Sequence, residues 1–211
     1  MQRRLRVVLA DDHETVRQGL RALFASVPGI DVVEEVGDAE SAIARTKALA
    51  PDLLVLDLSM PKTGGLAAIR ELKRVASKTA IVVLTRYRDA AFVREALSAG
   101  AVAYVLKQSP FSELHQAVTQ ASRGERYIDR ALAAQLEERP TIDASSRVSD
   151  RERDVLRRAA LGQSNKEIAS ALNIAVKTVE VHKTQGMRKL DLRDRSDLIR
   201  YATMQGWMSE P

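Results

Sequence analysis

Residues 52–61 read Asp-Leu-Leu-Val-Leu-Asp-Leu-Ser-Met-Pro, and they carry the strongest indication of the fold. Its apolar run is short and almost unbroken, which is typical of a strand that is covered on both faces in a parallel sheet. A carboxylate, Asp57, stands at the end of the run. The stretch therefore predicts a buried parallel strand with an acidic group at its carboxyl end.

On both sides of this strand, residues 1–122 alternate short apolar runs with helical stretches. The predicted strands are 5–10, 31–36, 52–58, 80–85 and 102–106. The predicted helices are 14–25, 38–49, 65–75, 90–99 and 112–123. Strands and helices that alternate through short links predict an α/β fold, a doubly wound sheet of five parallel strands with helices on both faces.

The rest of the chain changes character. Residues 123–146 are predicted to be a connector, with a helix over 128–138 followed by a polar, breaker-rich stretch. Residues 147–211 show no strand pattern and predict a small all-α domain of four short helices. Ser149 with Glu152 and Ser164 with Glu167 are capping-box patterns, and Ser196 is predicted to cap the last helix.

Composition and charge indicate one class of binding partner and exclude several kinds of functional site. The chain has 211 residues and a formal charge of +5, and residues 147–211 alone carry 13 basic and 9 acidic side chains, a net charge of +4. That asymmetry predicts an anionic partner for the last part. The absence of cysteine excludes disulfides, thiolate nucleophiles and cysteine-type zinc sites. No apolar run is long enough to span a membrane and no signal peptide is evident, so we expect a cytoplasmic protein without a membrane partner.

Five polar groups follow the predicted strands, and they are Asp11, Asp12, Asp57, Thr85 and Lys107. Because the carboxyl ends of parallel strands meet at one edge of a sheet, we expect these groups to converge. A single aspartate at such a position is usually a loop or cap residue. Clustered carboxylates favour Mg²⁺, and a carboxylate can also attack phosphorus to give an aspartyl phosphate. A lysine and a hydroxyl then hold the phosphoryl oxygens.

These residues, with the segment Asp57–Pro61 and the sequence Ala103-Tyr104-Val-Leu-Lys107, resemble the receiver domain of two-component response regulators over residues 1–122. The resemblance implies a flavodoxin-like fold in which Asp57 accepts a phosphoryl group from the phosphohistidine of a sensor histidine kinase. It also implies that Lys107 pairs with that group.

The same resemblance assigns the metal ligands and the switch residues. Mg²⁺ is expected to bind to Asp11, Asp12, Asp57 and the backbone carbonyl of Ser59. Thr85 is expected to move toward the phosphoryl group while Tyr104 turns inward, and Pro61 shapes the loop after Asp57. The residue after the switch threonine is usually small, but here it is Arg86, followed by Tyr87. Arg86 either extends into solvent, which we favour, or changes with Tyr87 the access to the phosphate and its lifetime.

Residues 147–205 resemble the LuxR-type helix-turn-helix output domain of NarL/FixJ response regulators. The resemblance rests on Val148-Ser-Asp-Arg-Glu152, Gly162-Gln-Ser-Asn-Lys-Glu-Ile-Ala169 and Val176-Lys-Thr-Val-Glu-Val-His182. It implies that the helix 176–190 recognises double-stranded DNA, with its first turns at the base edges. The residues expected to face outward near the start of this helix are Lys177, Glu180, Val181, Lys183 and Thr184, with Lys183 expected either to read guanine or to contact a phosphate. The residues expected at phosphates are Lys166, Thr178, Arg188, Lys189 and Arg195.

Two residues depart from that output-domain pattern. Ala175 stands where a serine often opens the recognition helix, so a cap worth about 1 kcal/mol is expected to be missing. Gly186 lies inside the helix, where glycine costs about 1 kcal/mol relative to alanine unless close packing requires it.

The last helix is expected to form a homodimer through Leu198, Ile199, Tyr201 and Ala202. The whole pattern predicts a transcriptional response regulator whose phosphorylation changes dimerisation or domain contacts and thereby operator binding, with RNA polymerase as a further candidate partner. It catalyses only its own phosphotransfer and dephosphorylation. A haloacid-dehalogenase-type hydrolase is a rival, but it needs an aspartate where Ser59 stands. A regulator that ignores phosphate and acts through protein contacts is the second rival.

Overall fold

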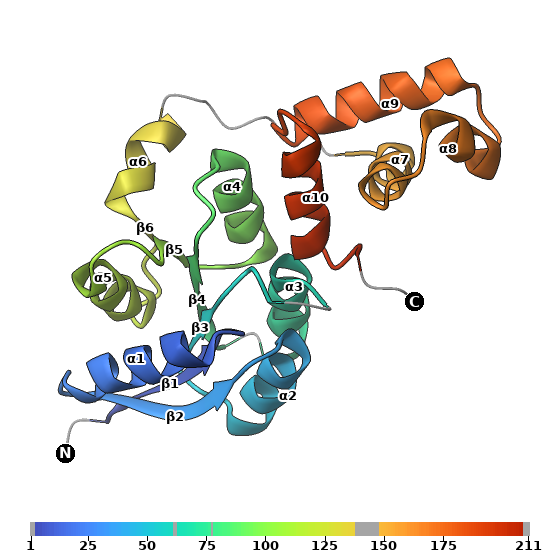
Figure 1. The fold of residues 1–211 in the computed structure, drawn as a ribbon. Coiled ribbons are helices and arrows are strands. Elements are labelled where there is room, and N and C mark those ends of the chain that lie inside the picture. Colours follow the sequence, from blue (N-terminus) through green and yellow to red (C-terminus); the bar gives the residue numbers. More distant parts are fainter. Residues whose placement is uncertain (1–2, 61–62, 77, 138–147, 209–211) are drawn as a thin grey trace. The chain divides into compact units, whose positions relative to one another are not determined.

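The computed structural model describes residues 3–60, 63–76, 78–137 and 148–208 (Figure 1). Contacts divide the chain into two compact units, one of Met1–Glu138 with Met204–Gly206 and the other of Arg139–Thr203 with Trp207–Pro211. Within the described ranges, no helix is both long and apolar enough to cross a lipid bilayer.

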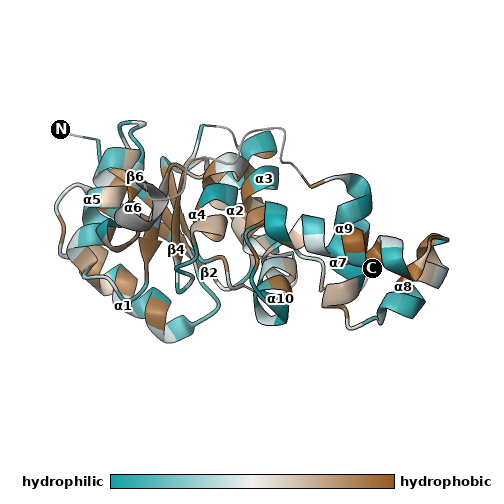
Figure 2. Cartoon of the chain, turned by 90° about the horizontal axis from the view of Figure 1, so that it is seen from above, coloured by the Kyte–Doolittle hydropathy of each residue, from teal (hydrophilic) through white to brown (hydrophobic). Residues whose placement is uncertain are grey.

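The first unit is built on a parallel sheet with the strand order β2-β1-β3-β4-β5-β6. The strands are β1 (Leu5–Ala10), β2 (Ile30–Val36), β3 (Leu53–Leu56), β4 (Ala80–Thr85), β5 (Ala103–Leu106) and β6 (Tyr127–Ile128). All four residues of β3 are buried, as its apolar sequence predicts for a central strand. The hydropathy view places hydrophobic strands between helices whose outer faces are hydrophilic (Figure 2). The predicted doubly wound α/β fold is confirmed.

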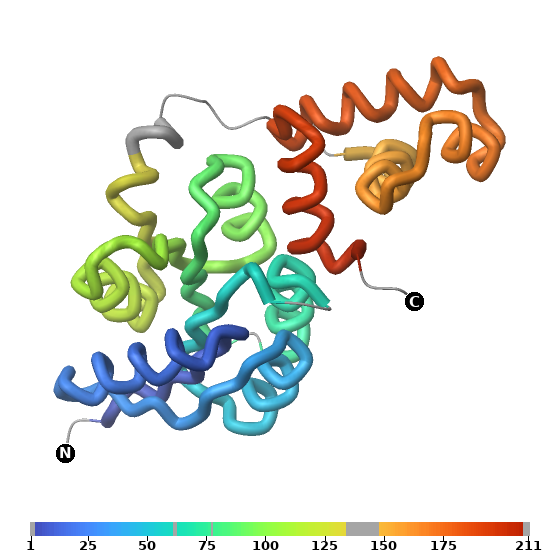
Figure 3. Tube along the Cα trace, in the orientation of Figure 1, coloured from blue at the N-terminus to red at the C-terminus, as the bar shows by residue number. Residues whose placement is uncertain are grey.

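Helices cover both faces of this sheet, and the crossovers can be followed along the chain in Figure 3. The helices are α1 (Glu14–Ala25), α2 (Ala39–Leu49), α3 (Gly65–Val75), α4 (Ala90–Ala99), α5 (Phe111–Ala121) and α6 (Arg130–Glu137). Helices α1 and α5 lie on one face, where Phe24 and Leu114 join the buried side chains of β1, β3, β4 and β5. Helices α2, α3 and α4 lie on the other.

One strand was not expected. The sheet has six strands rather than five, because Tyr127 and Ile128 pair in parallel with Ala103 and Tyr104 of β5. These two residues belong to the predicted connector, and the predicted helix there begins at Arg130 instead of Ile128. A strand of two residues is too short to show the alternation that identifies a strand in a sequence. The polar stretch of the connector from 139 to 146 lies outside the described residues.

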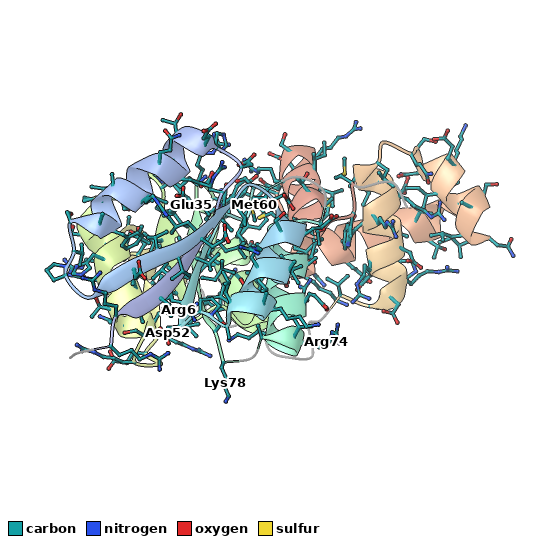
Figure 4. All side chains as sticks on the ribbon, turned by 90° about the horizontal axis from the view of Figure 1, so that it is seen from below. Arg6, Glu35, Asp52, Met60, Arg74 and Lys78 are labelled. Carbon is teal, nitrogen blue, oxygen red and sulfur yellow. The ribbon has the colours of Figure 1, made fainter. Side chains whose placement is uncertain are left out.

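Two contacts hold the ends of the sheet strands in place, one at each edge of the sheet. At the edge opposite the carboxyl ends of the strands, Arg6 and Asp52 lie next to each other (Figure 4), and the Arg6 backbone N–H donates to Asp52 Oδ2 at 2.9 Å. At the carboxyl ends, α3 begins directly against the loop after β3. A Cβ atom on Gly65 would lie 2.4 Å from Leu58 Cα, so only glycine permits this approach. Pro61 lies outside the described residues.

The second unit contains α7 (Asp150–Ala160), α8 (Asn165–Leu172), α9 (Val176–Lys189) and α10 (Arg195–Met204). Both predicted capping boxes are present. Ser149 Oγ accepts from the Glu152 backbone N–H, and Ser164 Oγ accepts from that of Glu167, with the glutamate side chain accepting in return each time. The four predicted helices of a helix-turn-helix domain are therefore confirmed.

The beginning of α10 differs from the prediction. Asp194 caps this helix, since its Oδ1 accepts from the Asp197 backbone N–H at 2.9 Å. Ser196 lies one residue inside the helix. The sequence Asp194-Arg-Ser-Asp197 contains three residues of capping type, and the pattern does not distinguish among them. At the start of α9, Ala175 forms no side-chain cap, as expected.

Candidate functional site

Three carboxylates and one imidazole meet at the carboxyl edge of the sheet. One ligand atom from each of Asp11, Asp12, His13 and Asp57 lies within 4.8 Å of the others. Asp11 stands at the end of β1 and Asp57 follows β3, and both are almost fully buried. The predicted convergence of the strand ends is confirmed for these aspartates.

Lys107 completes the cluster from the end of β5. Its Nζ lies 2.6 Å from Asp11 Oδ2 and 2.7 Å from Asp57 Oδ2, and its side chain is only 11% exposed. Its backbone N–H donates to the Thr85 carbonyl oxygen at 2.8 Å, which ties the ends of β4 and β5 together. One ammonium therefore bridges two buried carboxylates.

Asp57 is held from two sides. Its backbone N–H donates to the Ala10 carbonyl oxygen at 2.8 Å, and its Oδ1 accepts from the Ser59 backbone N–H at 3.0 Å. Burial raises the pKa of the Asp57 carboxyl, although the hydrogen bond and the charge of Lys107 act in the opposite direction. The carboxylate thus has one oxygen bound to the lysine and one to the loop backbone.

The donor set fits a divalent cation. Three carboxylates face one lysine in the described part of this site, and His13 adds a positive charge only when it is protonated. The arrangement leaves a net negative charge in a partly buried place, which is costly unless a cation neutralises it. Oxygen ligands of this kind suit Mg²⁺.

His13 is a site residue that the sequence reasoning missed. Its Nδ1 lies 2.7 Å from Asp12 Oδ1 and 3.2 Å from Asp11 Oδ1. The signal in the sequence is its position directly after two aspartates. Arg17 was missed as well, and its guanidinium donates to the Asp11 carbonyl oxygen at 2.6 Å.

The predicted switch residues are linked through Tyr87. Thr85 is fully buried, and its Oγ1 accepts from the Tyr87 backbone N–H at 3.4 Å. Tyr104 is also fully buried, and its hydroxyl donates to the Tyr87 carbonyl oxygen at 2.9 Å. The side chain of Tyr104 therefore already lies inward in this conformation. Arg86 is exposed, in agreement with the favoured interpretation that it extends into solvent.

The second unit carries a second candidate surface, on α9. The predicted contact residues that are exposed on this helix are Lys177, Glu180, Val181, Thr184 and Arg188. Thr178 and Lys183 are half-buried. These positions follow the spacing of one broad helix face, because residues three and four apart are neighbours on a helix.

Lys189 has a different environment from the other predicted phosphate contacts. Its Nζ lies 2.8 Å from Glu152 Oε2, and the Glu152 side chain is only 3% exposed. Burial acts to raise the pKa of Glu152, but the hydrogen bonds from Lys189 and Ser149 outweigh it, and the net pKa is lowered. This ion pair joins the beginning of α7 to the end of α9.

A hollow of about 540 Å³ lies beside the exposed face of α9. Its lining residues are Ala159, Gly162, Gln163, Ser164, Asn165, Lys183, Met187, Arg195 and Leu198. The hollow brings Lys183 and Arg195 together with the N-terminus of α8, and its lining contains no acidic side chain. Positive charge and a helix N-terminus favour an anion.

The predicted dimer residues of α10 are mostly buried within the single chain. Leu198, Tyr201 and Ala202 are at most 5% exposed, while Ile199 is 37% exposed. Leu198 lines the hollow beside α9, and the Tyr201 ring packs edge-on against Trp207 at 5.5 Å between ring centroids. Of the four, Ile199 has the most exposed side chain.

The chain matches two family models. Residues 7–119 match the response regulator receiver domain, and residues 146–202 match the bacterial regulatory proteins of the luxR family. The oxygen regulatory protein NreC of Staphylococcus haemolyticus is 35% identical over 209 residues, covering 94% of this chain and 96% of its own. The transcriptional regulatory protein LiaR of Bacillus subtilis is 35% identical over 203 residues, with the same coverage.

Solved structures agree with these relatives. The response regulator RcsB in complex with DNA has a TM-score of 0.74 and 30% identity, over 95% of this chain and 98% of that one. RcsB from Salmonella enterica serovar Typhimurium, bound to promoter P1flhDC with the phosphomimetic BeF₃⁻, has a TM-score of 0.78 and the same identity and coverage. The chain therefore belongs to the NarL-type response regulators, in which a receiver domain is followed by a LuxR-type regulatory domain.

Proposed function

We propose that the chain is a cytoplasmic DNA-binding transcriptional regulator, switched when a sensor histidine kinase transfers a phosphoryl group to Asp57. Residues 1–122 form the phosphoacceptor domain, residues 147–211 bind DNA, and 123–146 connect them, with β6 and α6 attached to the receiver sheet. The observation that carries the proposal is the buried Asp57 carboxylate, held by Lys107 beside two further aspartates.

The proposed chemistry is a phosphoryl transfer. An Asp57 oxygen attacks phosphorus, the bond from phosphorus to the kinase imidazole nitrogen breaks, and the imidazole keeps the electron pair and takes up a proton. Lys107, already between Asp57 and Asp11, pairs with the phosphoryl oxygens. Mg²⁺, held by Asp11, Asp12, Asp57 and the Ser59 carbonyl, would offset the negative charge. The chain acts on no separate substrate and catalyses only its own phosphorylation and dephosphorylation.

The proposed signal starts at Thr85. When its hydroxyl turns to the phosphoryl group, it releases the Tyr87 backbone N–H that it now accepts from. Tyr87 also accepts the hydroxyl of Tyr104, so its movement changes the surface between α4 and β5. Phosphorylation is thus a local charge change with a distant effect on dimerisation and domain contacts.

The output domain is proposed to place α9 in the major groove of double-stranded DNA. Glu180 and Val181 face base edges, where glutamate accepts from cytosine and an aliphatic side chain contacts the thymine methyl group. Lys183 and Arg195 hold a backbone phosphate at the hollow beside the N-terminus of α8. Lys189 contributes little to DNA, because its ammonium is bound to Glu152.

Two copies of the chain are proposed to bind two half-sites of an operator. One of the similar solved structures is a complex of RcsB with DNA, and another contains two RcsB dimers bound to two parallel DNAs. In the present chain, Ile199 is the exposed member of the predicted dimer set, so it is the first residue to test. RNA polymerase remains a candidate partner for the bound dimer.

Acetyl phosphate with Mg²⁺ tests the phosphoacceptor. Intact-mass measurement should show one added phosphoryl group on the wild type and none on Asp57→Asn. Asp31→Asn, which changes an exposed carboxylate on β2, is the matched control and should be labelled like the wild type. Full labelling of Asp57→Asn would contradict the assignment of Asp57.

A further inference from the structure

A buried carboxylate in the segment after the receiver helices has no role in the proposed mechanism. Asp129 is only 1% exposed, and within the described part of the chain no cation is paired with it. A buried carboxylate is costly unless hydrogen bonds satisfy both of its oxygens. Its environment therefore needs a specific explanation.

Both oxygens of Asp129 bind backbone N–H groups, and the two groups belong to different elements. Oδ2 accepts from Leu106 of β5 at 3.0 Å, and Oδ1 accepts from Ala131 in the first turn of α6 at 2.9 Å. The Asp129 backbone adds a third bond, since its N–H donates to the Tyr104 carbonyl oxygen at 2.8 Å. One side chain thus joins the end of a core strand to the beginning of a helix.

The strand end that Asp129 holds is the part of the receiver that meets the phosphorylation site. Leu106 directly precedes Lys107, whose ammonium binds Asp57. Tyr104, two residues earlier, is bonded through its hydroxyl to Tyr87. A shift of the β5 end therefore moves Lys107 at the phosphorylation site. It also moves the Leu106 backbone N–H, which is bound to the same Asp129 carboxylate as the first turn of α6.

The helix on the other side of Asp129 leads toward the output domain in the sequence. Separate contacts attach its start to α5, since the Tyr127 hydroxyl donates to Glu113 and the Arg130 guanidinium donates to Gln116 at 3.1 Å. These contacts do not involve β5 or the site. They allow the attachment of α6 to be changed independently of its link to Lys107.

We propose that Asp129 is a positioning residue that couples the Lys107 end of β5 to the start of α6. It fixes the strand end from which Lys107 reaches Asp57, and it passes a change at that end to the segment before the output domain. This inference rests on the proposed phosphorylation of Asp57.

The test uses the full chain and the variant Asp129→Asn. The single asparagine oxygen can accept from Leu106 or from Ala131 but not from both, so the amide N–H₂ faces the other backbone N–H and the side-chain link between β5 and α6 is broken. The initial rate of labelling by acetyl phosphate with Mg²⁺ should fall roughly three- to tenfold, the range for one lost hydrogen bond. Beryllofluoride should change amide hydrogen exchange in α6 of the wild type and leave α6 of the variant unchanged.

Tyr127→Phe is the matched control. It removes the hydroxyl contact with Glu113 and so loosens the same segment without touching Leu106, and its labelling rate should equal that of the wild type. Equal labelling of the wild type and Asp129→Asn would overturn the positioning role alone. An equal loss in Tyr127→Phe would also overturn it, because loosening would then explain the effect. A wild type that accepts no phosphoryl group would overturn the proposed function and this inference with it.

Discussion

At Gly186, the space for a single Cβ atom determines which residue fits inside α9. This glycine is buried inside α9, and a Cβ atom at its position would lie 2.9 Å from Leu156 Cδ1 of α7. We predict that Gly186→Ala is no more heat-stable than the wild type, because overpacking cancels the gain in helix propensity. Gly186→Ile should lose roughly 1–3 kcal/mol. Thermal unfolding, followed through Trp207, measures both variants.

The control for this prediction shortens the opposing side chain. In a Leu156→Val background, Gly186→Ala should recover part of the lost stability, since the two residues share one contact and their effects are coupled. Strictly additive changes in the free energy of unfolding would show that the glycine is not held by this contact.

The ionisation of Glu152 should make the stability of the fold depend on pH. Its pKa in the folded chain is below the ordinary value of 4.5, so its charged form stabilises the fold. That contribution is complete above pH 4.5 and is lost as the pH falls through the folded-state pKa. Relative to the wild type, Glu152→Gln should therefore be destabilised at neutral pH by roughly 1–3 kcal/mol and much less in acid. A difference that stays constant from neutral pH down into the acid range would exclude this ion pair as the cause.

At the scale of elements, the start of α9 is a place where one substitution should raise the stability of the fold. Ala175 has the extended backbone of a capping residue, with φ −68° and ψ 147°, but no side-chain acceptor. Ala175→Ser should raise the free energy of unfolding by about 1 kcal/mol. Ala175→Val has no acceptor either and is the control. A serine variant no more stable than the valine variant would mean that its hydroxyl does not bond to the first turn.

The elements also show where sequence reasoning works. The buried run of β3 and the capping boxes at Ser149 and Ser164 were predicted because each is a local pattern with one structural solution. Strand β6 and the Asp194 cap were missed, because a two-residue strand depends on its neighbour and Asp194 and Ser196 are both good capping residues within one turn. His13 was missed because a single histidine matches no metal-binding motif, and its partners are the two aspartates directly before it.

At the scale of the whole molecule, the charge of residues 147–211 predicts salt-sensitive DNA binding. Lys166→Ala and Arg195→Ala should each reduce the slope of log affinity against log salt concentration by about one, because each removes one phosphate contact. Arg153→Ala is the matched control, since this exposed arginine pairs with Asp150 on α7 and belongs to no predicted contact. Titrations at several salt concentrations give the slopes, and an equal loss in all three variants would mean that general charge explains binding.

If phosphorylation of Asp57 controls DNA binding, a selection of bound DNA fragments should respond to a phosphoryl mimic only when Asp57 is present. Genomic DNA fragments are selected with the full chain in the presence of Mg²⁺, with and without beryllofluoride, and with Asp57→Ala under both conditions. We predict that beryllofluoride enriches a set of sites with two-fold symmetric half-sites for the wild type and changes nothing for Asp57→Ala. The same fragments at the same enrichment in all four selections would show that phosphorylation of Asp57 does not control DNA binding.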